Sequence, residues 1–139
     1  MFSRVRVKKS ALNYFRKLAR DSSRLEIQAF LLGNILSVNE VEIVEFCYPT
    51  EYHTQKSNGV CWTADEYALV VKKADEEGLR IIGDIHSHPQ WDAVMSSIDY
   101  QSAITENLAV CGICSVYNNR TRVRFWTMTS ALPCKVEYV

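Results

Sequence analysis

Two histidines and an aspartate in this chain have the residue types and spacing to hold one metal ion. His86 and His88 lie two residues apart in an apolar stretch, and Asp99 follows further along the chain. Alternate residues of a strand point to the same side, so both imidazoles face one ion while Ser87 points away. Two neutral imidazoles plus a carboxylate leave a fourth coordination position open, which is typical of catalytic zinc sites. His86, His88 and Asp99 are therefore predicted zinc ligands.

Three neighbouring polar residues have alternative interpretations. Ser96 and Asp99 fit a helix capping pattern, so Ser96 either caps a helix or takes part in the chemistry. Asp92 lies in the same segment and is an alternative metal ligand. Asp84 precedes His86 by two residues on the same face, where it either orients the imidazole or is a surface carboxylate.

The whole pattern is more specific than its parts. His86-Ser87-His88, seven residues, Ser96, two residues and Asp99 resemble the JAMM (MPN-plus or JAB) metalloprotease motif without a gap. That family also has a glutamate that begins a strand ending in glycine seven residues later. Glu26 and Gly33 have this spacing. The resemblance extends from about residue 4 to about residue 128.

The resemblance implies a fold and an activity. The family fold is a curved mixed β-sheet flanked by helices, a cytidine-deaminase-like sandwich of the α/β (α+β) class. The family activity is zinc-dependent cleavage of isopeptide or peptide bonds, typically after the C-terminal tail of ubiquitin or a ubiquitin-like protein. The chain is thus expected to bind one zinc ion and a ubiquitin-like protein or its conjugate.

The resemblance also assigns roles to individual residues. His86, His88 and Asp99 would ligate zinc. Glu26 would bind the zinc water and act as general base and then as general acid. Ser96 would donate a hydrogen bond to the oxyanion of the tetrahedral intermediate.

The chain departs from the family pattern at single positions in two segments. Ala93 stands at a position where some members have cysteine, and Ala29 stands where many have glycine. Trp91 either contacts substrate or packs over the following helix.

Other functions are weaker alternatives. The same chemistry could serve a sulfur-carrier protein, a defence-system conjugate or a cell-wall peptide. A non-catalytic scaffold is disfavoured because all five catalytic positions are present. A zinc nucleoside deaminase is disfavoured because it requires H-x-E and P-C-x-x-C, which the chain lacks.

Hydrophobic periodicity indicates the elements that must position these residues. Strands are expected over 4–7, 26–33, 40–46, 79–88, 108–117, 122–128 and 134–139, and helices over 10–20, 64–77 and 97–106. The segment 49–60 is expected to be a loop. This order predicts a mixed sheet with packed helices.

Local signals predict the helix ends. Ser10 is expected to cap the first helix. Thr63 and Glu66 form an expected capping box for the second, and Gly78 ends it. The apolar stripe of this second helix is predicted to comprise Tyr67, Val70, Val71 and Ala74.

Composition sets outer limits on function. The 139 residues fit one domain, spanning 1–139, and carry no formal net charge, which argues against nucleic acid or an anionic membrane as partner. No apolar run reaches the length of a membrane span. The basic start of the chain is expected to be a strand and an amphipathic helix, with an organelle transit peptide as the alternative.

The cysteines favour a reducing compartment. Five cysteines at irregular spacing form no disulfide framework, which indicates a cytoplasmic protein. Cys111 and Cys114 form a CxxC, but residues three apart on a strand point to opposite faces. They are therefore expected to be core thiols rather than a chelating pair. The oligomeric state is not predicted.

Overall fold

The computed structural model describes residues 3–22, 24–50, 52–56, 59–89, 109–127 and 132–139, and between 52 and 61 it describes the backbone alone. The elements are β1 (Arg4–Val7), α1 (Lys9–Asp21), β2 (Gln28–Ile35), β3 (Glu40–Cys47), β4 (Tyr52–Lys56), β5 (Gly59–Trp62), α2 (Ala64–Glu77), β6 (Arg80–Pro89), β7 (Val110–Tyr117), β8 (Arg120–Thr127) and β9 (Lys135–Tyr138). The predicted helix over 97–106 lies outside the described residues.

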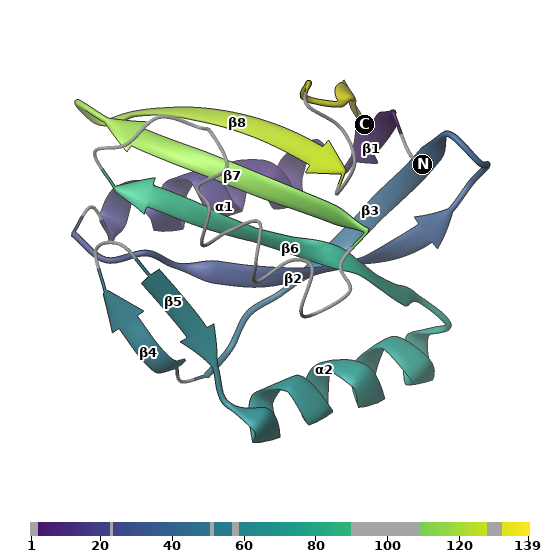
Figure 1. The fold of residues 1–139 in the computed structure, drawn as a ribbon, viewed down its shortest axis with the longest axis horizontal. Helices are drawn as coiled ribbons and strands as arrows, with labels where there is room; N and C mark the ends of the chain where they lie inside the picture. Colours follow the sequence, from purple (N-terminus) through teal and green to yellow (C-terminus); the bar gives the residue numbers. More distant parts are fainter. Residues whose placement is uncertain (1–2, 23, 51, 57–58, 90–108, 128–131) are drawn as a thin grey trace.

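A curved mixed sheet of seven strands organises the molecule (Figure 1). Its strand order is β8-β7-β6-β2-β3-β1-β9. β6 runs parallel to β7, and β1 runs parallel to β3 and β9, while the remaining pairs are antiparallel. The predicted fold class, a mixed sheet with flanking helices, is confirmed. β2 and β6, which are distant in sequence, are neighbours near the middle of the sheet.

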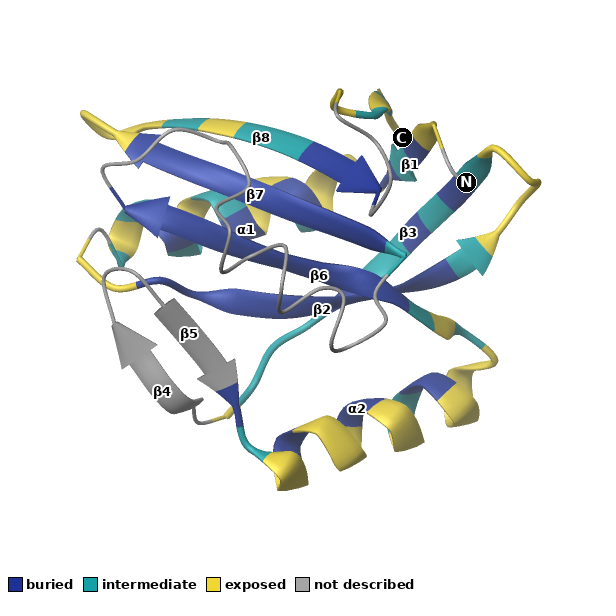
Figure 2. Ribbon diagram, viewed as in Figure 1, coloured by how far each residue is buried: buried dark blue, intermediate teal, exposed yellow. Residues whose placement is uncertain are grey.

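The main hydrophobic core lies between α1 and one face of the sheet. Leu12, Phe15 and Ala19 are the buried residues of α1. They belong to one cluster with sheet residues that include Leu31 and Ile85. The central strands β2, β6 and β7 are buried along most of their length (Figure 2). Burial of this apolar area fixes the strands that carry the polar residues of the other face.

A smaller cluster holds α2 against the other face of the sheet. Val70 and Ala74 of α2 are buried with Phe30, Leu32 and Trp62. The other two predicted members of the stripe lie at its edge, with exposed fractions of 40% for Tyr67 and 39% for Val71, although the Tyr67 ring still packs edge-on against Phe30. Val70 and Ala74 are thus the buried centre of the predicted stripe, and Tyr67 and Val71 are its partly exposed margins.

The predicted ends of α2 are largely confirmed. Thr63 Oγ1 accepts a hydrogen bond from the Glu66 backbone N–H at 3.1 Å, and Gly78 ends the helix with a left-handed φ of 67°. The Glu66 carboxylate does not form the other half of the capping box, a bond to the Thr63 backbone N–H. It accepts hydrogen bonds from the backbone N–H and the hydroxyl of Thr50, and so ties the chain after β3 to α2.

The prediction that Ser10 caps α1 is wrong, because the helix begins at Lys9 and Lys8 occupies the capping position. The Lys8 N–H donates to Ile43 O and the Lys9 N–H to Val139 O. Backbone carbonyls of β3 and of the residue after β9 thus satisfy these donors at the helix start, and the Ser10 side chain makes no cap.

Two segment boundaries also differ from expectation. β2 runs from Gln28 to Ile35, so Glu26 precedes the strand and Gly33 lies within it. The predicted loop over 49–60 is wrong in part, because β4 and β5 pair there as a two-stranded antiparallel sheet. A hairpin built largely from polar residues has no apolar alternation by which the sequence could reveal it.

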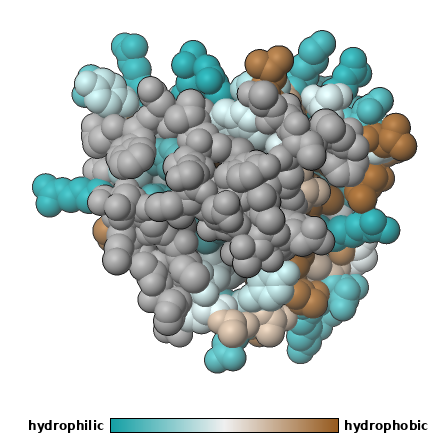
Figure 3. Space-filling model, viewed as in Figure 1, coloured by the Kyte–Doolittle hydropathy of each residue, from teal (hydrophilic) through white to brown (hydrophobic). Residues whose placement is uncertain are grey.

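The surface in view mixes hydrophilic and hydrophobic side chains around its rim (Figure 3). Among the described residues, no helix has the length and apolar character needed to cross a membrane.

Gly33 permits a close approach between β2 and β3. A Cβ at this position would collide with the backbone carbonyl of Glu42, next to the irregularity between Leu32 and Gly33. Gly33→Ala is therefore expected to lower the free energy of unfolding by about 3 kcal/mol, measured by urea denaturation. Gly78→Ala is the matched control: it has open space around it, and its left-handed φ should cost about 1 kcal/mol. Equal losses in the two variants would contradict the proposed backbone collision.

Candidate metal centre

The end of β6 places three polar side chains on one buried face of the sheet. Asp84, His86 and His88 alternate along the strand, and their exposed fractions are only 6%, 5% and 4%. Ser87 points to the opposite face and is fully buried. The predicted arrangement of the two imidazoles, on one side of a strand with Ser87 on the other, is what the structure contains.

Two hydrogen bonds hold the start of β2 against the end of β6. The Ile27 N–H donates to Ser87 Oγ at 2.9 Å, and the Ser87 N–H donates to Ile27 O at 2.9 Å. The serine hydroxyl thus takes the place of a backbone carbonyl in the strand ladder. Because Glu26 directly precedes Ile27, this pairing fixes the glutamate beside the histidines.

Glu26, His86 and His88 form a compact set of metal-binding groups. One ligand atom from each lies within 4.8 Å of the other two, and all three residues are buried. The Nε2 atoms of His86 and His88 are 3.2 Å apart. Two nitrogens bound to one tetrahedral zinc ion at ordinary distances are separated by about 3.3 Å. The donor types and the spacing of the imidazoles therefore fit a metal ion.

Asp84 is a buried partner of this centre rather than a surface carboxylate. Its Oδ2 accepts a hydrogen bond from Gln28 Nε2 at 2.5 Å and lies 3.9 Å from His86 Nδ1. A carboxylate on the far nitrogen of a ligating histidine favours the tautomer that leaves Nε2 free for metal. Of the two interpretations open for Asp84 in the sequence, the buried position supports the orienting one.

The two cysteines of the CxxC lie on opposite faces of β7, as predicted. Cys111 is buried in a cluster with Ile113 and Trp126, on the face that carries His86. Cys114 is buried in the α1 core, where burial raises the pKa of its thiol to about 12. The pair cannot hold one ion between them. Cys111 alone adjoins the metal-binding side chains.

Two of the predicted site residues lie outside the described residues, namely Ser96 and Asp99. The same holds for Trp91, Asp92 and Ala93. Their predicted roles as oxyanion donor, zinc ligand, substrate contact or alternative ligand therefore stay predictions.

Ser87 and Gln28 are site residues whose roles sequence reasoning missed. Ser87 was expected only to point away from the imidazoles. Its hydrogen bonds to Ile27 depend on the register between β2 and β6, which the sequence alone does not fix. Gln28 could have been found from alternation, because it lies two residues after Glu26 on the same side of the chain. The sequence pattern gave it no partner, whereas the structure pairs it with Asp84.

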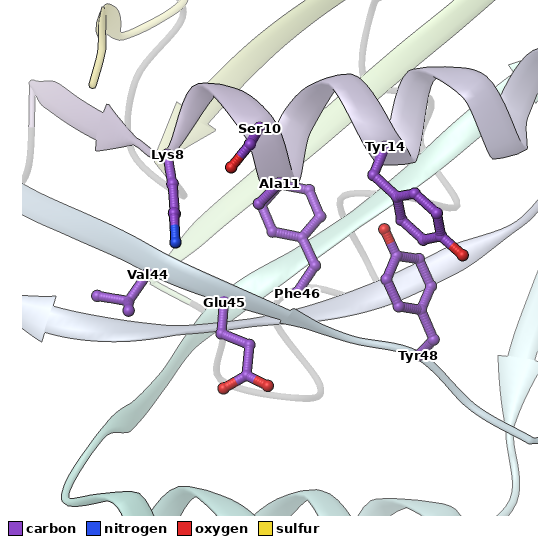
Figure 4. Close-up of a pocket in the computed structure, with 8 residues that line it drawn as sticks. All are labelled: Lys8, Ser10, Ala11, Tyr14, Val44, Glu45, Phe46 and Tyr48. Atoms are coloured by element: carbon purple, nitrogen blue, oxygen red, sulfur yellow. The ribbon is translucent and has the colours of Figure 1, made fainter.

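Two clefts among the described residues lie away from these side chains. A cleft of about 310 Å³ runs beside α1 and β3, with Tyr14 facing Tyr48 at one end (Figure 4). A second of about 430 Å³ shares both tyrosines and reaches Ile27. Neither is lined by Glu26 or the histidines. The chemistry of the donors identifies the site.

Comparisons with known proteins agree with this architecture. A family model described as prokaryotic homologs of the JAB domain matches residues 8–129. A comparison with curated proteins finds no match.

Solved structures share the fold at low sequence identity. A protein of Desulfitobacterium hafniense matches with a TM-score of 0.75 and 16% identity, over 97% of this chain and 92% of that one. A protein of Salinibacter ruber gives 0.62 and 22%, over 88% and 80%. A JAB1/MPN domain protein of Archaeoglobus fulgidus gives 0.62 and 16%, over 96% and 98%.

Removing the Ser87 hydroxyl should loosen the contact between β2 and β6. Ser87→Ala leaves the buried Ile27 N–H without its acceptor, so the free energy of unfolding should fall by about 1–3 kcal/mol in urea denaturation. Ser115→Ala, in the neighbouring strand, removes a hydroxyl whose bond to Arg122 O is 3.5 Å long, and should cost much less. Equal losses of unfolding free energy in the two variants would contradict a stabilising role for the hydrogen bond between Ser87 and Ile27.

Proposed function

Because the chain belongs to the family of prokaryotic homologs of the JAB domain, we propose that it is a zinc-dependent isopeptidase or peptidase that cleaves after the C-terminal tail of a ubiquitin-like protein. The observation that carries this proposal is the buried cluster of Glu26, His86 and His88. A non-catalytic scaffold would not need a carboxylate and two imidazoles gathered in this way.

Zinc is the metal that suits the donor set. His86 and His88 would hold it through Nε2, with Asp99 as the third protein ligand and one ion per chain. When bound, zinc supplies Lewis acidity, which polarises a carbonyl and lowers the pKa of a water molecule to about 7. The negative charge of Asp84, with Oδ2 3.9 Å from His86 Nδ1, favours the tautomer that carries its proton on Nδ1.

Glu26 is the proposed proton carrier. Its carboxylate lies among the histidine donors, so it can take a proton from the attacking water and pass it to the leaving amine nitrogen. Its buried position strengthens the interactions of its charge with polar groups nearby. Ser96 is proposed to donate a hydrogen bond to the developing oxyanion.

The tail of a ubiquitin-like protein is a suitable substrate because it is narrow and extended. Such a tail can bind as an additional strand along an open sheet edge. β4 and β5 form a separate two-stranded sheet, so within the described residues each has one edge without a partner strand. The four described cysteines are free thiols, which suits a reducing cytoplasm.

The alternative substrates share this chemistry. A sulfur-carrier protein or a defence-system conjugate would present a similar tail, whereas a cell-wall peptide would not. The reaction follows from the residues at the metal centre, and the substrate from the surfaces around it.

Glu26→Gln should separate metal binding from turnover. The amide keeps the shape of the side chain but cannot carry the proton, so the variant should bind one equivalent of zinc and lose turnover by a factor of about 100 or more. Zinc content is measured by elemental analysis, and cleavage with a ubiquitin-like fusion. Glu42→Gln, on β3, is the matched control and should retain activity.

Zinc retention in this series also tests the third ligand. Asp99→Asn is expected to release zinc, while Asp92→Asn, in the same segment, is expected to keep it. Loss of zinc in Glu26→Gln together with retention in Asp99→Asn would instead make Glu26 the third ligand, and the assignment of the base would be wrong.

A panel of ubiquitin-like fusions tests the proposed substrate. The zinc-loaded chain should cleave at least one fusion directly after the tail, and a chelator should abolish cleavage until zinc is restored. Sulfur-carrier fusions and cell-wall peptides belong in the same panel. Cleavage that ignores the chelator would refute the metalloenzyme, and cleavage of the cell-wall peptide alone would refute the ubiquitin-like substrate.

A further inference from the structure

A second group of metal-binding side chains lies next to the first, on the same buried face. Asp84 on β6 and Cys111 on β7 are directly opposite in the parallel ladder. One ligand atom each from Asp84, His86 and Cys111 lies within 4.8 Å of the other two. The exposed fraction of Cys111 is 2%, as low as those of its neighbours.

His86 lies between the two groups and presents a different nitrogen to each. Its Nε2 is 3.2 Å from His88 Nε2, and its Nδ1 is 3.9 Å from Asp84 Oδ2. The second group therefore begins where the first one ends, on the other side of the same ring.

We propose that Cys111 Sγ, His86 Nδ1 and the Asp84 carboxylate form a second position for a thiophilic divalent metal ion, such as cadmium or excess zinc. Thiolate and imidazole together are the ligands that such ions select. On binding, Cys111 releases its thiol proton to solvent and the thiolate becomes the ligand. Gln28 holds the Asp84 carboxylate by a hydrogen bond and orients it for this role.

The two positions exclude each other because they share one imidazole. A neutral imidazole has a single nitrogen lone pair, and the other nitrogen carries the proton. When Nδ1 binds the metal, Nε2 is protonated and His86 no longer serves the position beside His88. An ion at the second position is thus inhibitory, a consequence that rests on the proposed function, whereas the second position itself does not.

The two cysteines of the CxxC provide a matched pair for the test. Cys111 adjoins the metal-binding groups, whereas Cys114 packs in the α1 core on the opposite face. Substitution of either removes one buried thiol from the same strand, and only one substitution removes a proposed ligand.

The test is a titration of the metal-free full chain with cadmium chloride, followed by the ultraviolet thiolate-to-cadmium charge-transfer band. We expect the wild type and Cys114→Ala to form the band with one ion per chain, and Cys111→Ser to lose it. Persistence of the band in Cys111→Ser, or its loss in Cys114→Ala alone, overturns the proposal. If Cys111→Ser fails to fold by circular dichroism, Asp84→Asn decides: the band should require at least tenfold more cadmium, and an unchanged titration overturns the proposal.

A second arm tests the competition and separates it from the proposed function. In the chain loaded with one equivalent of zinc, cadmium should release zinc as the band forms, and Cys111→Ser should need at least tenfold more cadmium. Formation of the band with zinc still bound overturns the sharing of His86. If the chain takes no zinc but forms the band, the second position stands and the proposed zinc enzyme fails.

Discussion

The antiparallel pairing of β2 with β6 is the constraint on which the site depends. Glu26 and His86 are sixty residues apart in the sequence, and bringing them together requires closing a long loop. The entropic cost of closure rises only slowly with loop length, and the strand ladder and the buried core offset it. Ser87 secures the end of this ladder by bonding to both the N–H and the C=O of Ile27. The pairing of Ile27 with Ser87 thus sets where the Glu26 backbone lies.

The two faces of the sheet serve different purposes. The face under α1 is apolar and holds the strands at fixed spacing. The other face combines a small apolar cluster under α2 with buried acids, imidazoles and an amide. Buried polar groups are costly unless they have partners, and the pairing of Gln28 with Asp84 meets part of that cost. A buried cluster of acids and imidazoles on one face of a sheet is typical of a functional site.

His86 occupies the most constrained position of this polar face. It has a histidine on one side, a carboxylate on the other, and a thiol on the adjacent strand. Two of these neighbours, Asp84 and Cys111, are also the partners of His86 in the proposed second position. The proposed metal centre therefore lies beside the proposed second position, because both use donors of the same chemical kind.

The sequence by itself determined the fold class and the pair of histidines that the structure places in the candidate metal centre. The H-x-H spacing placed both imidazoles on the same side of a strand. The same two-residue alternation placed Cys111 and Cys114 on opposite faces. Periodicity also located α2. Its caps were predictable because Thr63 and Gly78 form hydrogen bonds only with residues of the adjacent helical turn. Tertiary structure decided what local patterns do not contain. It shifted the start of α1 to Lys9 through strand carbonyls, paired a polar segment as β4 and β5, and buried Asp84 beside Gln28. These features depend on strand register, and register is set by contacts between residues that are far apart in the chain.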